Sequence, residues 1–355
     1  MPRKETKTTP PGRELRWIDW IRRLERPTRS RAGSSFPLGI GDDAAVWTPR
    51  RGYRVVLTID TQVEGVHYRR DWLTPREIGR RAVAVAVSDL AAMAARPVAI
   101  LVSILAREET REPEFKALHT GIRQASRQYG VAILGGNLSA GHDSVTVTAL
   151  GEGKESDLIT RGGARAGDEL WVTGTPGLAR LGLCSLERGS RKSPGQQRQR
   201  ASAAVREGMR AFKTPTARTR EALALACDWG PTAMIDLSDG LATDVAHILE
   251  ESSTKRRTLG AELEKTAFLK MRRLVRLASE LGEDPLSTAL KGGDDYELCF
   301  AAPSGPHQRR LASTFKKKFH LEVTRIGRIV KAPGIRLVDA DGAVKKVTQR
   351  GWEHF

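Results

Sequence analysis

Residues 74–95 form an alanine-rich segment with helix-start signals. This segment limits the possible folds of the chain more than any other sequence feature. Thr74 fits the N-cap of a helix, Pro75 its first position, and Glu77 the residue that completes a capping box. The body RRAVAVAVSDLAAMAA carries small residues on every side, and we expect the helix to run to about Ala95, before an Arg-Pro pair. Such a helix should pack closely against a sheet or a partner chain.

Apolar runs around this helix predict strands that alternate with helices, which is the pattern of an α/β or α+β domain. In chain order we expect a strand at 54–59 that ends at Asp60, a strand at 98–105, a helix at 113–129 stopped by Gly130, a short strand at 131–134 that leads into Gly135-Gly136-Asn137, and a strand at 144–150.

A glycine-rich stretch at 161–168, RGGARAGD, predicts a linker between two α/β domains. We therefore expect an N-terminal extension at 1–31, an N-terminal domain at 32–160 and a C-terminal domain at 161–355. The second domain should contain strands at 169–173, 233–236, 296–301 and 321–330, a helix entered through 174–177, and a helix from Ser238-Asp239-Gly240 to Glu251.

The net charge of +17 invites a nucleic-acid interpretation, but the charge is localised. Residues 1–31 carry ten Lys/Arg against four Asp/Glu, and residues 187–220 carry ten against two. We expect the first segment to be a polar tail and residues 187–205 to be a flexible basic loop, both solvated. No RNP-like motif, helix-turn-helix signature or zinc finger accompanies them, so we expect no nucleic-acid partner.

Other sequence features indicate a cytoplasmic protein without a membrane partner. No apolar run reaches the roughly 20 residues that span a bilayer, and the N-terminus lacks the apolar region of a secretory signal. Cys184, Cys227 and Cys299 are far apart and form no CxxC pair, so we expect reduced cysteines rather than disulfides or a zinc site.

Seven carboxylates nevertheless lie in short Gly/Ser-rich or Ala-rich stretches of this basic chain. They are Asp42, Asp43, Asp60, Asp89, Asp236, Asp239 and Asp294. Mg²⁺ is held by a few carboxylates together with phosphate oxygens, so the set predicts an enzyme that acts on phosphates. The chain has no Walker A loop, kinase motif pair or GxGxxG opening a helix, so carboxylate-held metal ions would have to position the phosphates.

Each carboxylate also has a structural alternative. The Gly-Asp-Asp stretches at 41–43 and 293–295 are typical of turns, and Asp60 could cap a loop. Ser238 or Asp239 could cap the helix that follows. Asp89 is different, because a carboxylate within an apolar helix is costly unless it is paired or liganded.

The joint occurrence of these motifs carries more weight than any one of them. In order, GIGDDAAV, TIDTQVEGVHY, AVSDLAAM, LGGN, ITRGGARAGDELWVTGTPGLARLGL, IDLSDGLATDVAHI, GGDDYELCF and GWEHF resemble thiamine-monophosphate kinase, in the superfamily of aminoimidazole ribonucleotide synthetase. The resemblance runs from about residue 36 to 355. It implies a two-domain fold whose N-terminal domain forms a homodimer and the ATP site. It also implies transfer of the ATP γ-phosphate to thiamine monophosphate, giving thiamine diphosphate and ADP.

By motif position the resemblance also implies roles for individual residues. Expected Mg²⁺ ligands are Asp43, Thr58, Ile59, Asp60, Asp89, Asn137, Asp236 and Asp239, with Asp60, Asp89 and Asp239 central to catalysis. Expected ATP contacts are Gly136, Asn137, Arg161 and Ser238. Expected thiamine-phosphate contacts are His67, Asp294 and Trp352, whose indole suits a cationic thiazolium.

Three positions depart from the family pattern. Asn137 stands where the family has a metal-binding Asp, so one Mg²⁺ should bind more weakly. Asp294 stands where Glu is usual, which shortens its reach by one methylene. Ala86 occupies a position that is commonly Asn.

Three alternatives stay open at the level of sequence. One is another enzyme of the superfamily with a different acceptor; the chain lacks the reactive residue of selenophosphate synthetase and the terminal Cys of the hydrogenase maturation type. Another is a non-catalytic nucleotide- or thiamine-phosphate-binding protein, which would explain Asn137 as decay. The third is nucleic-acid binding through the basic segments.

Overall fold

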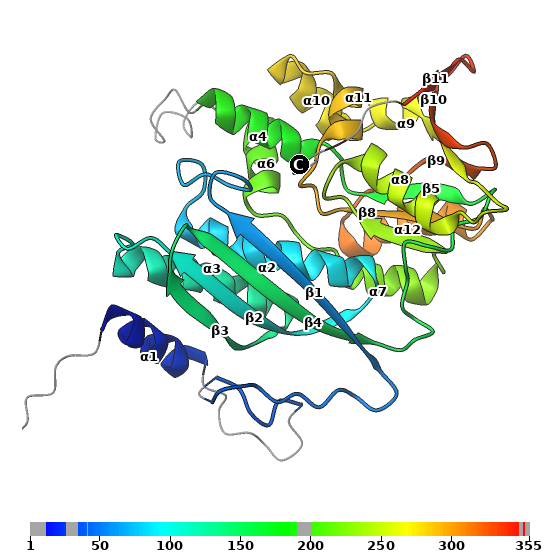
Figure 1. Ribbon diagram of the computed structural model, residues 1–355. Helices are drawn as coiled ribbons and strands as arrows, with labels where there is room; N and C mark the ends of the chain where they lie inside the picture. Colours follow the sequence, from blue (N-terminus) through cyan, green and yellow to red (C-terminus); the bar gives the residue numbers. More distant parts are fainter. Residues whose placement is uncertain (1–11, 26–34, 41, 190–200, 348–350, 352–355) are drawn as a thin grey trace, which may run out of the picture.

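The computed structural model describes residues 12–25, 35–40, 42–189, 201–347 and 351. These residues form two sheet-and-helix units side by side, the first blue to green and the second green to red (Figure 1). This architecture agrees with the predicted α/β fold of two domains.

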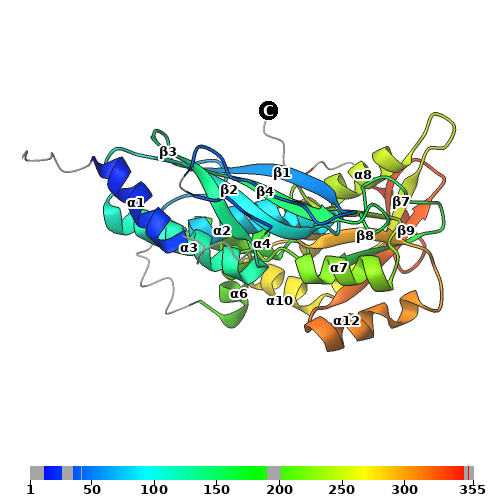
Figure 2. The same cartoon turned by 90° about the horizontal axis from the view of Figure 1, so that it is seen from below.

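The first unit is a four-stranded sheet covered on one face by two helices. Its strands, in spatial order, are β1 (Arg54–Val63), β4 (Ser144–Gly153), β2 (Arg96–Ala106) and β3 (Ala132–Ala140). Its covering helices are α2 (Pro75–Ala92) and α3 (Glu112–Tyr129). Figure 2 shows these helices beneath the sheet, while no described helix covers the face above.

The capped helix forms as predicted. Glu77 donates its backbone N–H to the Thr74 hydroxyl, and its carboxylate accepts the Thr74 N–H at 2.8 Å, which completes the capping box. The helix ends at Ala92, three residues earlier than predicted, because Ala94 adopts a left-handed φ of 52°. Most α2 residues are buried between the sheet, α3 and α7 (Thr219–Asp228), as its small side chains require.

Two strands near the predicted site residues are longer than expected. β1 does not end at Asp60 but continues to Val63, because residues 61–63 keep their antiparallel pairing with β4. β3 does not stop before the glycines. It includes Gly136 and Asn137, which pair with Val102 and Ser103 of β2.

The second unit is a seven-stranded sheet with helices on both faces. In spatial order its strands are β11 (Val344–Lys346), β10 (Gly334–Val338), β7 (Gly260–Glu264), β9 (Val323–Val330), β5 (Glu169–Thr173), β8 (Leu298–Ala302) and β6 (Ala233–Asp236). The predicted strands at 169–173 and 233–236 are confirmed, and those at 296–301 and 321–330 begin two residues later than expected.

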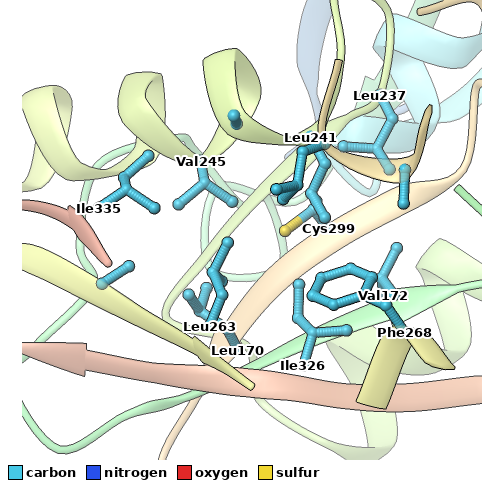
Figure 3. Packing of buried hydrophobic residues seen from close by; sticks show 14 of the residues in the cluster. Leu170, Val172, Leu237, Leu241, Val245, Leu263, Phe268, Cys299, Ile326 and Ile335 are labelled. Atoms are coloured by element: carbon cyan, nitrogen blue, oxygen red, sulfur yellow. The ribbon is translucent and has the colours of Figure 1, made fainter. Parts of the chain in front are cut away.

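The helices of the second unit divide between the faces of its sheet. On one side lie α4 (Leu178–Gly189), α6 (Ala203–Lys213), α8 (Leu241–Ser252), α9 (Lys265–Leu269), α10 (Arg272–Leu281) and α11 (Pro285–Lys291). Figure 3 shows Leu241 and Val245 of α8 above Leu170, Leu263 and Ile326 of the sheet. On the other side lie α7, the short helix η1 (Gln308–Arg310) and α12 (Leu311–Phe319).

The N-terminal extension contains a helix that the sequence did not predict. Helix α1 (Arg13–Glu25) buries Trp17, which stacks on Phe115 of α3 with ring centroids 4.1 Å apart. At the basic loop, residues 187–189 belong to α4 and residues 203–205 to α6, while residues 190–200 lie outside the described part of the chain. No helix among the described residues is long and apolar enough to cross a membrane.

Candidate active site

Four of the predicted carboxylates meet where the two sheet-and-helix units join. Asp60 lies on β1 and Asp89 on α2, while Asp236 ends β6 and Asp239 precedes α8. Asp60 interacts electrostatically with the other three and shares a hydrogen bond with Asp89. We call these four residues the carboxylate group.

Strand alternation explains why Asp60 faces inward. Thr58, Asp60 and Gln62 lie on the face of β1 that α2 covers, while Leu57 and Ile59 point to the opposite face and are 63% and 66% exposed. Thr58 donates its hydroxyl to the Asp89 carboxylate at 2.5 Å.

The first unit is also linked to the second at this point. Ser88 of α2 donates its hydroxyl to Asp236 Oδ2 at 2.6 Å, within a buried environment. Ser88 and Asp89 are adjacent on α2 and make contacts with different units. Ser88 orients a carboxylate of the second unit, and Asp89 is oriented by Thr58 of β1.

The electrostatics of the carboxylate group favour a bound cation. Burial, followed by the charges of Asp89 and Asp236, raises the pKa of Asp60 to about 7. Burial and the charge of Asp89 raise the pKa of Asp236 to about 7 as well. Burial also raises the pKa of Asp89, although the Thr58 hydroxyl and Arg161 oppose the shift. Mutually repelling carboxylates in a cleft are typical of a functional site.

The donor set fits Mg²⁺ rather than a metal held by the protein alone. Within the described part of the chain, no three His, Cys, Asp or Glu side chains are arranged to hold a metal ion by themselves. Magnesium in phosphate-processing enzymes is usually bound by one or two carboxylates, waters and the substrate's phosphates. An all-oxygen group with raised pKa values suits that mode of binding.

Two pockets adjoin the carboxylate group from different sides. The first, which we call the Arg161 pocket, has a volume of about 450 Å³ and includes Thr58 and Asp89 in its lining, with Met93 and Met234 among its apolar residues. The second, which we call the Asp294 pocket, measures about 490 Å³ and includes Asp60 and Asp239. The remaining residues of the Asp294 pocket are Gln62, Val66, His67, Trp72, Arg180, Leu183, Phe212, Ser238, Lys291, Gly293, Asp294, Tyr296 and Gly351.

The structure thus brings most predicted site residues to these two pockets. Arg161 lines the first, while His67 and Asp294 line the second. Ser238, expected to contact ATP, lies beside Asp239 in the Asp294 pocket. Trp352 lies outside the described residues, but its neighbour Gly351 lines this pocket and donates its N–H to Thr243 at 2.7 Å.

Other predicted residues lie apart from the carboxylate group. Asn137 is exposed on β3 and shares with Ile59 the sheet face that no described helix covers, so its side chain is on the side of the sheet opposite Asp60. Gly136 precedes it and packs against the Val102 carbonyl. Asp43 is exposed. The charges that raise the pKa values of Asp60 and Asp236 come from other members of the carboxylate group and not from Asp43.

Sequence reasoning missed several residues of the Asp294 pocket. Trp72 and Phe212 supply aromatic surface, and Arg180 and Lys291 supply positive charge. Arg81, which is fully buried, bonds to Asp294 behind the pocket wall. An arginine within a run of small apolar residues was the one available signal, because a buried cation requires a partner.

Comparisons with known proteins identify the family that this chain resembles. Residues 41–153 match the family described as AIR synthase related protein, N-terminal domain. The thiamine-monophosphate kinase of Mycobacterium tuberculosis is 32% identical over 339 residues, which cover 94% of this chain and 90% of that protein. The thiamine-monophosphate kinase of Bacillus subtilis is 29% identical over 328 residues, covering 91% and 94%.

Solved structures of thiamine-monophosphate kinases are also similar to this chain. Thiamine-monophosphate kinase from Stenotrophomonas maltophilia K279a matches with a TM-score of 0.76 and 32% identity, over 92% of this chain and 95% of that one. The structure described as AaThiL complexed with AMPPCP and TMP matches with a TM-score of 0.72 and 27% identity, over 96% and 97%. Hydrogenase maturation protein HypE, at 18% identity and a TM-score of 0.71 over 95% and 97%, shares the fold. The chain belongs to the thiamine-monophosphate kinase family.

Proposed function

We propose that this chain transfers the γ-phosphate of ATP directly to the phosphate of thiamine monophosphate, yielding thiamine diphosphate and ADP in thiamine diphosphate biosynthesis. The observation that carries the proposal is the position of the carboxylate group between two pockets, each large enough for part of the reacting pair. A related structure that holds AMPPCP, an ATP analogue, together with TMP supports it. The compartment would be the cytoplasm.

The nucleotide is assigned to the Arg161 pocket. Arg161 provides a cation for phosphate oxygens, and Met93 and Met234 provide apolar surface for a base. Asp89 lines this pocket and belongs to the carboxylate group, so the terminal phosphates of a nucleotide bound here would point toward that group.

Thiamine monophosphate is assigned to the Asp294 pocket. Its aromatic residues Trp72, Phe212 and Tyr296 suit a cationic heteroaromatic ring, because a ring face attracts positive charge. Arg180 and Lys291 offer positive charge to the acceptor's phosphate. Trp352 is expected to complete this pocket from the chain end that follows Gly351.

The carboxylate group would hold the metal ions, with Asp60, Asp89, Asp236 and Asp239 as ligands. When bound there, Mg²⁺ supplies positive charge that offsets the repulsion between the donor and acceptor phosphates. The protein's contribution is orientation: Thr58 fixes the Asp89 carboxylate and Ser88 fixes that of Asp236. Thr58 and Ile59 could add backbone oxygens.

The reaction needs alignment more than proton transfer. The acceptor oxygen of thiamine monophosphate is already anionic near neutral pH, so no general base is required. The two pockets would hold the acceptor oxygen and the γ-phosphorus in line, with ADP leaving on the nucleotide side.

A homodimer accounts for the exposed apolar residues on the sheet face that no described helix covers. Val55, Leu57 and Ile59 expose 45–66% of their surface along β1, and Leu101 of β2 continues this apolar patch. We expect a second copy to cover this patch. Asn137 lies on the same face, and Leu57 of the patch also lines the Arg161 pocket, so in a dimer Asn137 and Gly136 would approach the nucleotide held in the Arg161 pocket of the partner subunit.

Product analysis with purified protein tests the proposal. Incubation with ATP, Mg²⁺ and thiamine monophosphate should give thiamine diphosphate and ADP in equal amounts. Asp239→Ala should lower turnover about 100-fold or more, because it removes charge that positions the phosphates. The matched control Asp228→Ala alters an exposed carboxylate in the same unit and should leave turnover unchanged.

A Mg²⁺ titration distinguishes the role of Asn137. Since an amide brings no negative charge, the wild type should need more Mg²⁺ than Asn137→Asp does. Absence of product at every Mg²⁺ concentration, with ATP still bound, would exclude this acceptor and favour another superfamily reaction or a binding role.

A further inference from the structure

A single buried arginine connects several walls of the Asp294 pocket. Arg81 has 0% of its surface exposed and lies on α2. Its Nε donates to Gln62 Oε1 at 2.8 Å, and its two terminal nitrogens donate to the Phe212 carbonyl and to Asp294 Oδ1. The guanidinium also lies over the Phe212 and Tyr296 rings, at 4.7 and 5.8 Å from their centroids.

The four residues that Arg81 contacts come from three distant parts of the chain. Gln62 belongs to β1, Phe212 to α6, and both Asp294 and Tyr296 to the segment that enters β8. All four line the Asp294 pocket. Arg81 therefore lies behind the pocket wall and is positioned to fix several lining groups at once, without touching a bound molecule.

The backbone of this segment needs such support. Asp294 and Tyr296 adopt left-handed φ values of 66° and 51°, which are unfavourable for residues with a Cβ. Their N–H groups donate to the carbonyls of Ser238 and Leu237, each at 2.8 Å. These bonds hold the backbone, but they leave the direction of the Asp294 carboxylate undetermined.

The side-chain contacts fix that direction. Asp294 Oδ1 accepts from both Arg81 and the Tyr296 hydroxyl, the latter at 3.0 Å. The Asp294 side chain remains 31% exposed, against 1% for that of Arg81, so part of the carboxylate faces the pocket. The long, planar guanidinium compensates for the short reach of an Asp at this position, because it brings its donors to the carboxylate while two other bonds anchor it.

We propose that Arg81 is a positioning residue for acceptor binding, which holds the Asp294 carboxylate and the Phe212 wall in the geometry that recognises thiamine monophosphate. This inference rests on the proposed function. It assigns Arg81 no part in the chemical step and no contact with the nucleotide.

The test compares steady-state kinetics of Arg81→Lys with those of the wild type. Lysine keeps the charge, but its donors all sit on one nitrogen and cannot span the three acceptors that the guanidinium reaches from three nitrogens, so Asp294 and Phe212 lose their common anchor. We expect the KM for thiamine monophosphate to rise about 10- to 100-fold, because displacement by about 1 Å has effects of this size. The KM for ATP and kcat should stay within about threefold of wild type, as for lost ground-state binding.

A matched control and a rescue separate positioning from general stability. Arg218→Lys disturbs another arginine, whose side chain is 19% exposed and whose carboxylate partner Glu297 lies in the same segment but outside the pocket lining. It should leave the KM for thiamine monophosphate unchanged. Adding Asp294→Glu to Arg81→Lys returns the lost methylene of reach and should bring that KM back to within about threefold of wild type.

Tyr296→Phe gives an independent measurement in a variant of nearly unchanged volume. It removes the hydroxyl that donates to Asp294 and should raise the same KM in the same direction. An Arg81→Lys protein with unchanged KM for thiamine monophosphate would overturn the inference. Equal rises in both KM values, or no rescue by Asp294→Glu, would also overturn it. If the wild type forms no thiamine diphosphate, the proposed function fails before the variants are compared.

Discussion

Replacing Asp60 with Asn tests the electrostatic description of the carboxylate group. The substitution removes one negative charge from the group and leaves a side chain of nearly the same size. Asp60 is the member whose pKa is raised by burial and then by all three of the others, Asp89, Asp236 and Asp239. Its removal should therefore relieve repulsion throughout the group.

The sign and size of the effect follow from the pKa of Asp60. The unfolded chain releases this proton near pH 4, whereas the folded, metal-free protein holds it until about pH 7. Between these values the unfolded state binds fewer protons, so the free energy of unfolding falls as pH rises and levels off above pH 7. A shift from 3.8 to about 7 corresponds to as much as about 4 kcal/mol. Asn carries no such penalty, so Asp60→Asn should be the more stable protein at pH 8, by about 2–4 kcal/mol.

Urea denaturation in the presence of EDTA, at pH 4 and pH 8, measures this difference. The stabilisation by Asp60→Asn should appear at pH 8 and vanish near pH 4, and added Mg²⁺ should stabilise the wild type more than the variant. Asp228→Asn changes an exposed carboxylate and serves as the control. If Asp60→Asn is no more stable than wild type at pH 8 without metal, the repulsion inferred for the group is wrong.

Three further predictions concern the rest of the molecule. Leu57→Glu should convert a dimer into monomers in analytical ultracentrifugation, whereas Val344→Glu, at another exposed apolar position, should not; a Leu57→Glu protein that stays dimeric would place the interface elsewhere. Gly136→Ala would place a Cβ 1.7 Å from the Val102 carbonyl oxygen, so it should lower stability by about 1–3 kcal/mol in thermal melts; an unchanged melting temperature would contradict the packing of β3 on β2. Trp17→Ala should weaken the docking of α1 by about 3 kcal/mol, which hydrogen exchange would detect as faster exchange in that helix. Protection equal to wild type would exclude Trp17 as the residue that docks α1.

The elements that the sequence predicted well carry their signals locally. Thr74, Pro75 and Glu77 define the start of α2 within four residues, and Gly130 adopts the left-handed conformation that ends α3. Such signals do not depend on the rest of the fold, so a single sequence is sufficient to find them.

The elements that were missed depend on distant partners. β1 runs past Asp60 because β4 pairs with it, and Gln62 is buried there as an acceptor for Arg81. Helix α1 is held by the stacking of Trp17 on Phe115, about a hundred residues away in the chain. Neither interaction leaves a pattern in its own segment.

In the candidate site, too, the sequence identified individual residues but not the contacts between distant parts of the chain. Asp60, Asp89, Asp236 and Asp239 stood out from their local sequence and were given ligand roles by the motif resemblance, but their meeting point required the structure. The position of Asn137 on the opposite sheet face was likewise invisible in the sequence, because it depends on the register of β3 against β2.

The carboxylate group also has a consequence for how the two units are joined. Asp60 and Asp89 come from the first unit, and Asp236 and Asp239 from the second, so repulsion within the metal-free group acts across the junction. The Ser88–Asp236 hydrogen bond and the Arg81–Asp294 ion pair act across the same junction in the opposite sense. Binding of cations to the group would remove the repulsion while leaving these links in place. Metal binding, docking of the two units and the shape of the acceptor pocket should therefore be coupled, and the Asp60→Asn and Arg81→Lys variants probe that coupling from its two ends.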